Sequence, residues 1–349
     1  MKAKGYIIIP MSETLYRKYR PKVFDEVVGQ ETVINSLRNG LKNETLAHAY
    51  IFAGSRGIGK TSIARIFANA IGVSANDLYE IDAASNRGID DIRAIKDAVA
   101  TLPFDSKYKL YIIDEAHMLT KEAWNALLKT LEEPPEHVIF ILATTELEKI
   151  PDTILSRCET HTFRKPDQST LVEVIKRTAK KEGFTIDTES AEVIALLADG
   201  SFRDAHGALQ KVISSINSKT ITLKEVEEIS GAPKSSMVVH IIEAISNKDV
   251  AKALEVVALL RKENRDVKAF MKLLLEKVRA ILLVRIGGSL KEAELSRLSD
   301  DHKAFVESEA KKSGITSESL LILLDAFEKV SRSSFPDVAL EAVLLSYLK

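Results

Sequence analysis

The sequence is poor in cysteine and in long apolar runs. Its one cysteine in 349 residues, Cys158, excludes an internal disulfide and a zinc site made of several cysteines, and it fits a reducing compartment. No apolar run approaches the roughly 20 residues of a membrane-spanning helix. The apolar stretch at residues 6–9 is too short for a secretory signal and is closed by Pro10. We therefore expect a cytoplasmic protein that does not associate with a membrane.

An excess of charge of either sign is also missing. Lysine and arginine together number 49 and aspartate and glutamate 50, which gives a formal net charge of −1. Such a chain has no overall attraction to nucleic acid, so any contact with DNA must come from local basic patches. With 349 residues, of which 45% are hydrophobic, it can form two or three domains with their own cores. The organised sequence begins just after Met11, which is a candidate, besides Met1, for the native first residue.

A phosphate-binding loop is the strongest motif in the chain. Residues 50–70 change from an apolar run to a glycine-rich turn and then to helical periodicity, which predicts strand, loop and helix. Within this stretch, residues 54–61 fit the pattern GxxxxGK[ST] of nucleotide-binding proteins. The alternative, a glycine turn beside a surface lysine, leaves the complete pattern unexplained.

The chemistry of this loop explains its residue types. Glycines allow several backbone N–H groups to surround a triphosphate, and the dipole of the following helix adds to the attraction. Lys60 would reach the β- and γ-phosphates, and the Thr61 hydroxyl would be a magnesium ligand. The expected nucleotide contacts of the loop are Gly54, Ser55, Arg56, Gly57, Ile58, Gly59, Lys60, Thr61 and Ser62.

A second motif, KLYIIDEAH at residues 109–117, is an apolar strand that ends in two acids. In an open α/β fold, acids at the carboxyl end of a buried parallel strand lie beside the phosphate loop. Asp114 would hold magnesium, usually through water, and Glu115 would orient and activate the attacking water. The tetrapeptide DEAH also occurs in a helicase superfamily, but the chain has no second RecA-like domain. We therefore interpret His117 as structural.

Five predicted strands alternate with helices as far as about Lys165, which predicts a doubly wound parallel sheet. The fourth of these strands, at 137–146, ends in Thr144 and Thr145, whose hydroxyls could contact the γ-phosphate or the water. The helix at 120–133 has an apolar stripe that includes Trp124, which we expect in the core. Beyond Lys165 the pattern is helical throughout.

Six stretches carry a resemblance to a known family. They are YRKYRPKVFDEVVGQ, GSRGIGKTSIAR, EIDAASNRGIDDIR, YIIDEAHMLTKEAWNALLKTLEEPPEHVIFILATTE, ILSRC and GSFRDAHGALQ. With them the chain resembles AAA+ ATPases and, more narrowly, the gamma/tau subunits of the bacterial DNA polymerase III clamp loader. The stretches cover residues 16–210 almost without a gap. Past residue 231 the resemblance is weaker and rests on helical pattern and length.

The resemblance implies the architecture of an AAA+ protein, an α/β domain followed by all-α domains. Residues 1–167 would form the nucleotide-binding domain with a doubly wound parallel sheet of five strands. Residues 168–230 would form a helical lid domain that carries sensor 2. Residues 231–349 would form a helical collar domain for oligomerisation.

The resemblance also implies further site residues. Arg157 of the SRC motif resembles the arginine finger, which completes the ATP site of a neighbouring subunit and so requires an oligomer. Thr145 aligns best with sensor 1, although Thr144 is adjacent, and Arg203 resembles sensor 2. The segment that resembles the adenine and ribose pocket, which favours ATP over GTP, contains Tyr19, Pro21, Val28 and Gly29.

One departure from the family concerns zinc. Gamma/tau subunits usually carry a four-cysteine zinc module before the EIDAAS strand, whereas here that interval is only residues 71–78, IGVSANDL. We therefore expect no zinc. The sequence also stops after the third domain, so the tau-specific regions that recruit polymerase and helicase are expected to be missing, through truncation or a short natural form.

The function implied by the resemblance is that of an ATP-hydrolysing motor subunit in a DNA-directed DNA polymerase holoenzyme. It would open a sliding clamp and load it on primed DNA during replication, with ATP and Mg²⁺ as cofactors. Its partners would be delta, delta prime, further gamma/tau copies, the sliding clamp and primed-template DNA bound through its backbone. The alternatives are another AAA+ DNA motor, such as a Holliday-junction motor, a replication factor C small subunit, or a clamp-loader scaffold subunit without hydrolysis.

Overall fold

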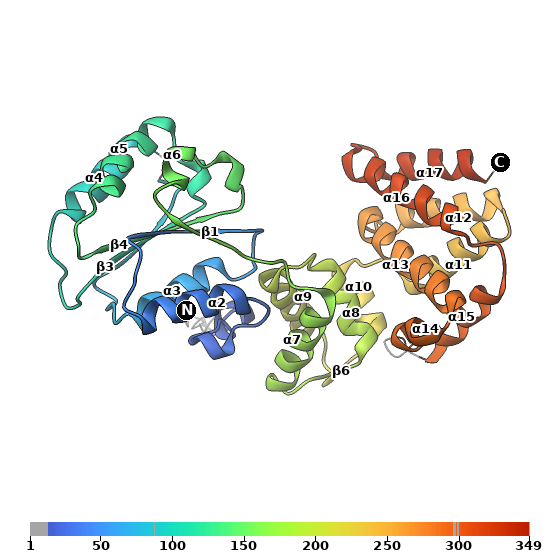
Figure 1. Cartoon of the computed structure of the whole chain (residues 1–349). Coiled ribbons are helices and arrows are strands. Elements are labelled where there is room, and N and C mark those ends of the chain that lie inside the picture. Colours follow the sequence, from blue (N-terminus) through green and yellow to red (C-terminus); the bar gives the residue numbers. More distant parts are fainter. Residues whose placement is uncertain (1–12, 87, 296–297, 299, 349) are drawn as a thin grey trace, which may run out of the picture. The chain divides into compact units, whose positions relative to one another are not determined.

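The computed structural model describes residues 13–348 except 87, 296–297 and 299, so both candidate start residues lie outside the described part. The chain divides into two compact units (Figure 1). The first unit is Met1–Thr170 with Gly200–Arg203, and the second is Leu171–Asp199 with Asp204–Lys349. Helices from both the expected lid and the expected collar belong to the second unit, and their division near residue 230 stays a prediction.

The first unit is built on a five-stranded sheet. Its strands are β1 (Ala49–Ala53), β2 (Leu78–Asp82), β3 (Lys109–Asp114), β4 (Val138–Thr144) and β5 (Glu159–Thr162). They lie in the order β2-β3-β4-β1-β5, and every pairing is parallel. The register pairs Ala53 with Thr144 and Asp82 with Asp114, so the carboxyl ends of the strands meet at one edge. The predicted doubly wound parallel sheet is confirmed.

Helices cover both faces of this sheet (Figure 1). One face packs against α4 (Ile89–Val99), α5 (Lys121–Glu132) and α6 (Asp152–Leu155), and Trp124 of α5 is 4% exposed, as expected for the core. The other face packs against α2 (Glu31–Lys42) and α3 (Lys60–Ala70). Because both faces are covered, the central strands are continuous apolar runs. The shorter elements are α1 (Leu15–Lys18), η1 (Phe24–Glu26), η2 (Ala116–Met118) and η3 (Leu147–Lys149).

Helices account for most of the remaining chain. They are α7 (Gln168–Lys181), α8 (Thr188–Leu197), α9 (Phe202–Ser215), α10 (Leu223–Ser230), α11 (Ser235–Ser246), α12 (Val250–Lys262), α13 (Val267–Ile286), α14 (Gly288–Leu295), α15 (Asp300–Lys311), α16 (Ser317–Arg332) and α17 (Pro336–Tyr347). The prediction of helix throughout was wrong at two places, β6 (Thr185–Ile186) and β7 (Thr220–Ile221), which pair in parallel. Strands of two residues are too short to give an alternating pattern in the sequence.

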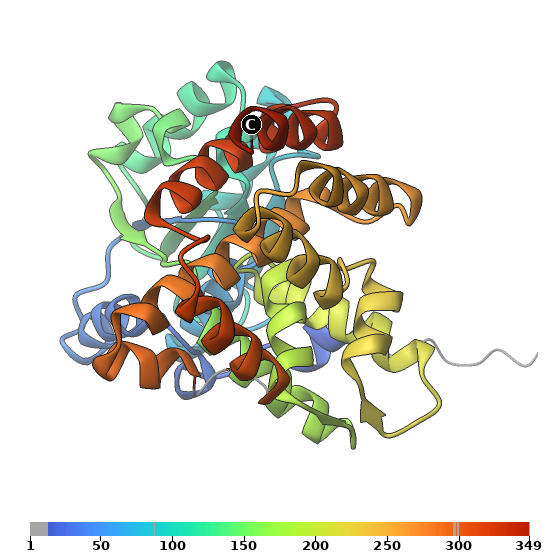
Figure 2. The ribbon, with the colours of Figure 1, turned by 90° about the vertical axis from the view of Figure 1, so that its right-hand side faces the viewer.

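Within the second unit, α11 packs on α12 and α16 on α17, around the long helix α13 (Figure 2). Phe270, Leu274 and Ile281 of α13 are fully buried in this core. Arg285, in the last turn of α13, donates to the carbonyls of Ala310, Lys312 and Ile315. It thereby satisfies carbonyls at the end of α15 and in the connection to α16. Within the described part of the chain, no helix has both the length and the apolar character needed to cross a membrane.

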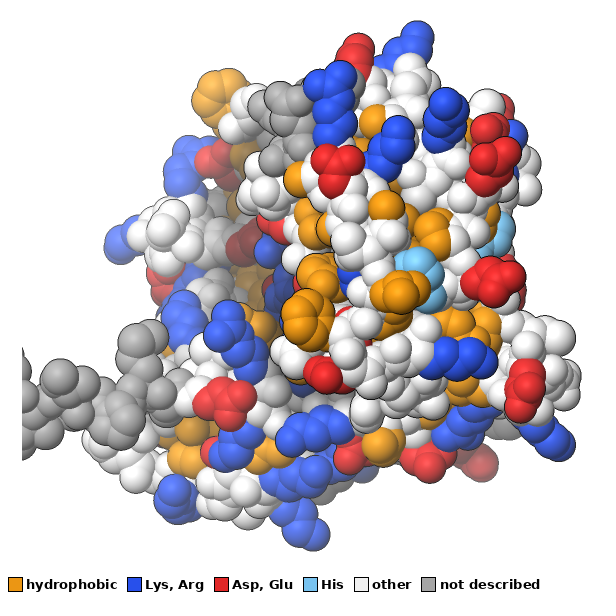
Figure 3. Space-filling view, turned by 90° about the vertical axis from the view of Figure 1, so that its left-hand side faces the viewer, with side chains coloured by type: hydrophobic (Ala, Val, Ile, Leu, Met, Phe, Trp, Pro, Cys, Tyr) orange, Lys and Arg blue, Asp and Glu red, His pale blue; other side chains and the backbone are white. Residues whose placement is uncertain are grey.

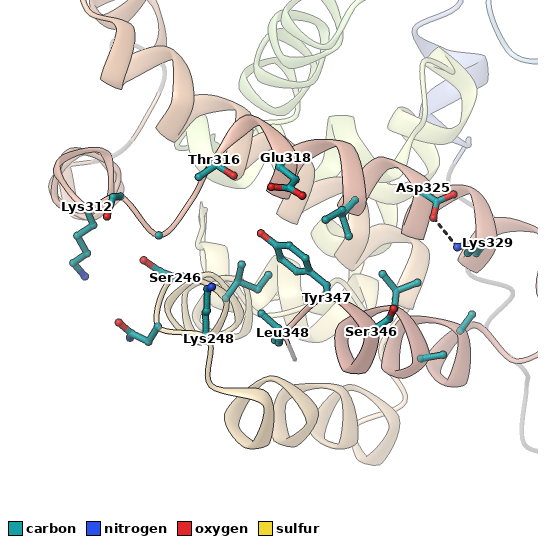
Figure 4. Close-up of a pocket in the computed structure, with 18 of the residues that line it drawn as sticks. Ser246, Lys248, Lys312, Thr316, Glu318, Asp325, Lys329, Ser346, Tyr347 and Leu348 are labelled. Atoms are coloured by element: carbon teal, nitrogen blue, oxygen red, sulfur yellow. Dashed lines mark hydrogen bonds and ion pairs between the residues drawn. The ribbon is translucent and has the colours of Figure 1, made fainter.

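An open groove of about 1540 Å³ lies in the second unit, between the end of α11, the connection from α15 to α16, and the helices α16 and α17 (Figure 4). Its walls carry polar side chains such as Lys248, Lys312 and Thr316, and the Tyr347 hydroxyl lies 2.7 Å from Ser319 Oγ. None of the expected nucleotide-site residues lines this groove.

Candidate nucleotide-binding site

The phosphate loop connects the end of β1 to the start of α3, as predicted. Gly54 has φ 149°, and a Cβ atom there would lie 2.7 Å from Ile58 Cδ1 and 2.8 Å from the Phe163 carbonyl oxygen. Both the backbone angle and the lack of space therefore require glycine. The loop can curl over the edge of the sheet because this position carries no side chain.

Lys60 lies back on its own loop. Its Nζ donates to the carbonyl oxygens of Gly54 at 2.6 Å and Ser55 at 2.9 Å, and the residue is 6% exposed. Burial lowers the pKa of the Lys60 ammonium, whereas the charges of Glu115 and Asp114 oppose this shift. The cation thus lies in the loop, close to both acids at the carboxyl end of β3, with contacts that a phosphate could replace.

The two expected magnesium ligands are in contact. Thr61 Oγ1 at the start of α3 donates to Asp114 Oδ2 at the end of β3, over 2.9 Å. Oxygen donors of this kind are the ligands that Mg²⁺ prefers. Residues 53 positions apart are brought together because the loop and β3 end at the same edge of the sheet.

Glu115 and Thr145 also meet at this edge. Glu115 has φ 50°, a left-handed conformation that costs a residue other than glycine about 1–2 kcal/mol. Its Oε2 accepts a hydrogen bond from Thr145 Oγ1 at 3.2 Å. Thr144, by contrast, is fully buried and its Oγ1 accepts from the Glu146 N–H at 3.0 Å. Of the two threonines, Thr145 is therefore the one that contacts the expected catalytic acid.

The segment that contains Arg20 lies beside the phosphate loop and contacts α3. Tyr19, Pro21, Val28 and Gly29 are half-buried, and their expected role in an adenine pocket stays a prediction. Arg20 Nε donates to Ser62 Oγ at 3.0 Å, a contact with α3 that sequence reasoning missed. Its position inside the stretch YRKYRPKVFDEVVGQ was the only signal that could have found it.

Arg203 also lies near the loop. The N–H of the preceding Phe202 donates to the Gly57 carbonyl oxygen at 3.0 Å. A Cβ atom at Gly57 would lie 2.1 Å from Ser201 Oγ, so glycine permits this close approach. The guanidinium carbon of Arg203 lies 6.0 Å from the centre of the Tyr16 ring, and its positive charge contributes to the lowered pKa of Lys60.

Arg157 has a different environment. Its Nη2 donates to Glu132 Oε1 at 2.7 Å, and its Nη1 donates to the Thr153 carbonyl oxygen at 2.6 Å and lies 3.2 Å from Ser156 Oγ. None of these partners belongs to the phosphate loop of the same chain. The residue is half-buried, so part of the guanidinium remains accessible to another molecule.

The parallel sheet, with a phosphate loop after β1 and acids at the carboxyl end of β3, defines a P-loop nucleotide-binding protein with the AAA+ fold. A solved structure with this fold is the RuvB Holliday junction branch migration motor of Thermotoga maritima. Its TM-score is 0.53, with 24% identity, over 71% of this chain and 86% of that chain. At this level of identity the likeness shows the fold alone.

Sequence relatives give the particular family. The model for the delta subunit of DNA polymerase III matches residues 29–80 and 73–167, and the model for domain III of its gamma and tau subunits matches residues 221–349. DNA polymerase III subunit tau of Bacillus subtilis is 36% identical over 95% of this chain. Subunit gamma of Buchnera aphidicola subsp. Schizaphis graminum is 35% identical over 76% of this chain and 78% of its own length. The chain belongs to the family of DNA polymerase III gamma and tau subunits, as the resemblance implied.

The relatives differ in how much of their length this chain covers. It spans 62% of the Bacillus subunit tau and 39% of the gamma/tau subunit of Mycoplasma pneumoniae, which is 40% identical over 71% of this chain.

Proposed function

We propose that the chain is an ATP-hydrolysing motor subunit of the DNA polymerase III clamp loader, which opens a sliding clamp and loads it on primed DNA. One observation carries the proposal. The five side chains needed for hydrolysis, hereafter the hydrolysis set, converge at one edge of the sheet in a member of the gamma/tau family. They are Lys60, Thr61, Asp114, Glu115 and Thr145.

In the proposed reaction, Lys60 exchanges its loop carbonyls for oxygens of the β- and γ-phosphates. Thr61 and Asp114 would hold Mg²⁺, which neutralises charge on the transferred phosphoryl group when bound. Glu115 orients the attacking water and takes up its proton, and the hydroxyl of Thr145 keeps the carboxylate of Glu115 in place. Arg203, whose backbone lies next to Gly57, adds positive charge near Lys60.

Arg157 acts in the neighbouring subunit's site. Its contacts with Glu132 and Thr153 hold the guanidinium away from its own phosphate loop, which supports a role in trans. An arginine supplied by a neighbour requires an assembly, so delta, delta prime and further gamma/tau copies are the proposed partners. ATP binding would draw subunits together through Arg157, and hydrolysis would let them separate.

Contact with DNA would be through backbone phosphates, with strong salt dependence and little sequence preference. The net charge is −1, so the contact would depend on local groups of Lys and Arg side chains, and Figure 3 shows Lys and Arg along the lower part of one face with acidic side chains between them. The proposed DNA partner is in the cytoplasm.

Two alternatives are less well supported. A Holliday-junction motor shares the fold, but identity to RuvB is 24% against 36% to the Bacillus subunit tau. A scaffold subunit would not need the hydrolysis set.

We also propose that the protein binds no zinc. Elemental analysis of the purified protein tests this, and zinc near one atom per chain would contradict it.

The test of the proposed function is the rate of ATP hydrolysis by the chain mixed with its loader partners, with and without sliding clamp and primed-template DNA. We expect marked stimulation that needs both clamp and DNA. Hydrolysis that is indifferent to both would favour another AAA+ motor, and no hydrolysis in the full assembly would favour the scaffold.

A further inference from the structure

His117 lies inside the site, beside the hydrolysis set. Its side chain is 6% exposed in η2, two residues after Glu115. The imidazole Nδ1 lies 3.1 Å from Thr144 Oγ1 and 3.5 Å from Glu115 Oε2, and Nε2 lies 3.2 Å from Glu146 Oε1. The imidazole therefore bridges the turn after β3 and the segment that follows β4.

The neighbours of the ring define where its proton lies. Lys149 Nζ contacts Glu146 Oε2 at 2.7 Å, and this hydrogen bond lowers the pKa of the Glu146 carboxyl. An ionised carboxylate can only accept, so we expect Nε2 of His117, which lies 3.2 Å from Glu146 Oε1, to carry a proton. In the neutral imidazole, Nδ1 is then the acceptor, and the Thr144 hydroxyl donates to it.

These contacts close a ring made of two hydrogen bonds and one ion-pair contact. Thr144 Oγ1 accepts from the Glu146 N–H at 3.0 Å and lies 3.1 Å from His117 Nδ1, while His117 Nε2 lies 3.2 Å from Glu146 Oε1. The ring joins both ends of the tripeptide Thr144–Glu146 to η2. Its middle residue, Thr145, is the one that donates to Glu115.

Glu115 needs such support because its backbone is in the left-handed region, at φ 50°. Its carboxylate is held by the Thr145 hydroxyl, and the position of Thr145 is held by the ring. Loss of the imidazole would remove the support of Thr145 and so weaken the contact between Thr145 and Glu115, although no atom that binds nucleotide would have been removed.

We propose that His117 is a positioning residue for hydrolysis, which locks the Thr144–Glu146 segment to η2 and so keeps Thr145 and Glu115 in register. The inference rests on the proposed function. It differs from our interpretation of His117 as merely structural, because a packing role predicts loss of stability without a selective loss of turnover. A positioning role predicts a lower kcat at unchanged nucleotide affinity.

The experiment compares the variants His117→Ala and His117→Gln in the reconstituted loader with clamp and primed DNA. We expect kcat to fall about 10- to 100-fold in His117→Ala, since small misplacements in a site cost this much. The dissociation constant for a fluorescent ATP analogue, measured on the isolated chain, should stay within about twofold. His117→Gln should recover several-fold of the lost rate, since its amide can donate to Glu146.

The matched control is His137, whose Nε2 lies 3.2 Å and 3.1 Å from the carbonyl oxygens of Val99 and Thr101, outside the site. His137→Ala should leave kcat within about twofold. Glu146→Ala should reproduce the effect of His117→Ala, and the double variant should be no slower than either, because the two residues act as one unit.

The outcomes separate the two proposals. A wild-type assembly that hydrolyses no ATP would overturn the proposed function and this inference with it. If the wild-type assembly hydrolyses ATP and His117→Ala has the same kcat, the inference alone would be overturned. The same holds if kcat and nucleotide affinity both fall in His117→Ala. Long-range ¹H–¹⁵N spectra of the ring nitrogens give a readout independent of activity. We expect the proton on Nε2, and a proton on Nδ1 alone would contradict the ring.

Discussion

Lys60 in the first unit and Lys277 in the second are both lysines whose pKa is lowered by burial, yet their surroundings differ. Lys60 donates to two carbonyl oxygens of a glycine-rich loop. Lys277 lies in the middle of α13, and burial lowers its pKa to about 8 even though the charges of Glu189, Glu192 and Glu276 oppose the shift.

This difference separates a lysine whose contacts are loop carbonyls from a lysine that is buried among packed helices. Loop carbonyls can give up a lysine to a phosphate without disturbing the fold. Glu189 and Glu192 belong to α8, so their charges cannot move away from Lys277 of α13 unless these two helices separate. The contacts of Lys60 could therefore be replaced by a phosphate, whereas Lys277 is held within the helical packing of the second unit.

The largest effect we expect is that of Arg157→Ala, which extends the comparison to a charge used between subunits. Hydrolysis in the assembly should fall about 10³-fold, because arginine fingers contribute at least that much to phosphoryl transfer. Nucleotide affinity of the isolated chain should not change. The control Arg38→Ala removes another ion-paired arginine of the first unit, bound to Asp25, and should leave hydrolysis unchanged. An equal loss of hydrolysis rate in both variants would contradict a specific role of Arg157 in catalysis.

The second effect is that of Glu115→Gln, which keeps the size of the side chain and removes the carboxylate that we propose as the general base. Steady-state hydrolysis should fall about 10²-fold or more, as expected when a general base is lost. ATP should still bind, since Lys60 and the loop are intact. Glu122→Gln, an exposed position on α5, is the control and should retain the wild-type rate. Normal hydrolysis by Glu115→Gln would show that another group activates the water.

The third effect concerns protein stability. Asp77 in the first unit is a buried carboxylate that, like Lys277 in the second, we assign a structural role. Its carboxylate accepts from the N–H groups of Phe104, Asp105 and Ser106 at 2.6–2.9 Å. Burial alone would raise the pKa of Asp77, but these hydrogen bonds lower it to about 2. Its stabilising effect is therefore present above the ordinary pKa of a carboxyl, and it is lost as the pH falls toward 2.

Asp77→Ala should cost about 3 kcal/mol of unfolding free energy, since it leaves backbone donors without a partner. Asp77→Asn should cost less, because one oxygen can still accept. Asp97→Ala, at an exposed position on α4, serves as control. Denaturant unfolding at pH 7 gives the three values, and equal values for Asp77→Ala and Asp97→Ala would contradict the assigned role.

A smaller effect concerns Glu192 in the second unit. Burial first, and then the charges of Glu189 and Glu276, raise the pKa of its carboxyl to about 7. The folded state therefore binds more protons than the unfolded state between about pH 4.5 and 7, and the unfolding free energy should decrease as the pH rises through this range.

Glu192→Gln should remove this slope and increase stability at pH 7.5 by about 2 kcal/mol. The measurement is the melting midpoint against pH, with the exposed Glu255→Gln as control. A slope that persists in Glu192→Gln would place the titration on another group.

Local sequence patterns predicted most of the first unit. The phosphate loop depends on neighbouring residues, and β4, Val138–Thr144, lies within the strand predicted at 137–146 because its pattern is local too. Contacts between distant residues left no such signal. Arg20 meets Ser62 across 42 positions, and the ring around His117 depends on the adjacency of β3 and β4. In the second unit, β6 and β7 are too short to leave a pattern.

The measurement that most directly tests the comparison of the two lysines is the melting midpoint of Lys60→Met and Lys277→Met, with and without Mg²⁺ and ATP. A ligand at 100 times its Kd stabilises the folded wild type by about 2.7 kcal/mol, which raises the midpoint. We predict that Lys60→Met loses this ATP-dependent rise, whereas Lys277→Met retains it in full despite a changed midpoint without ATP. A rise that persists in Lys60→Met, or disappears in Lys277→Met, would contradict the account.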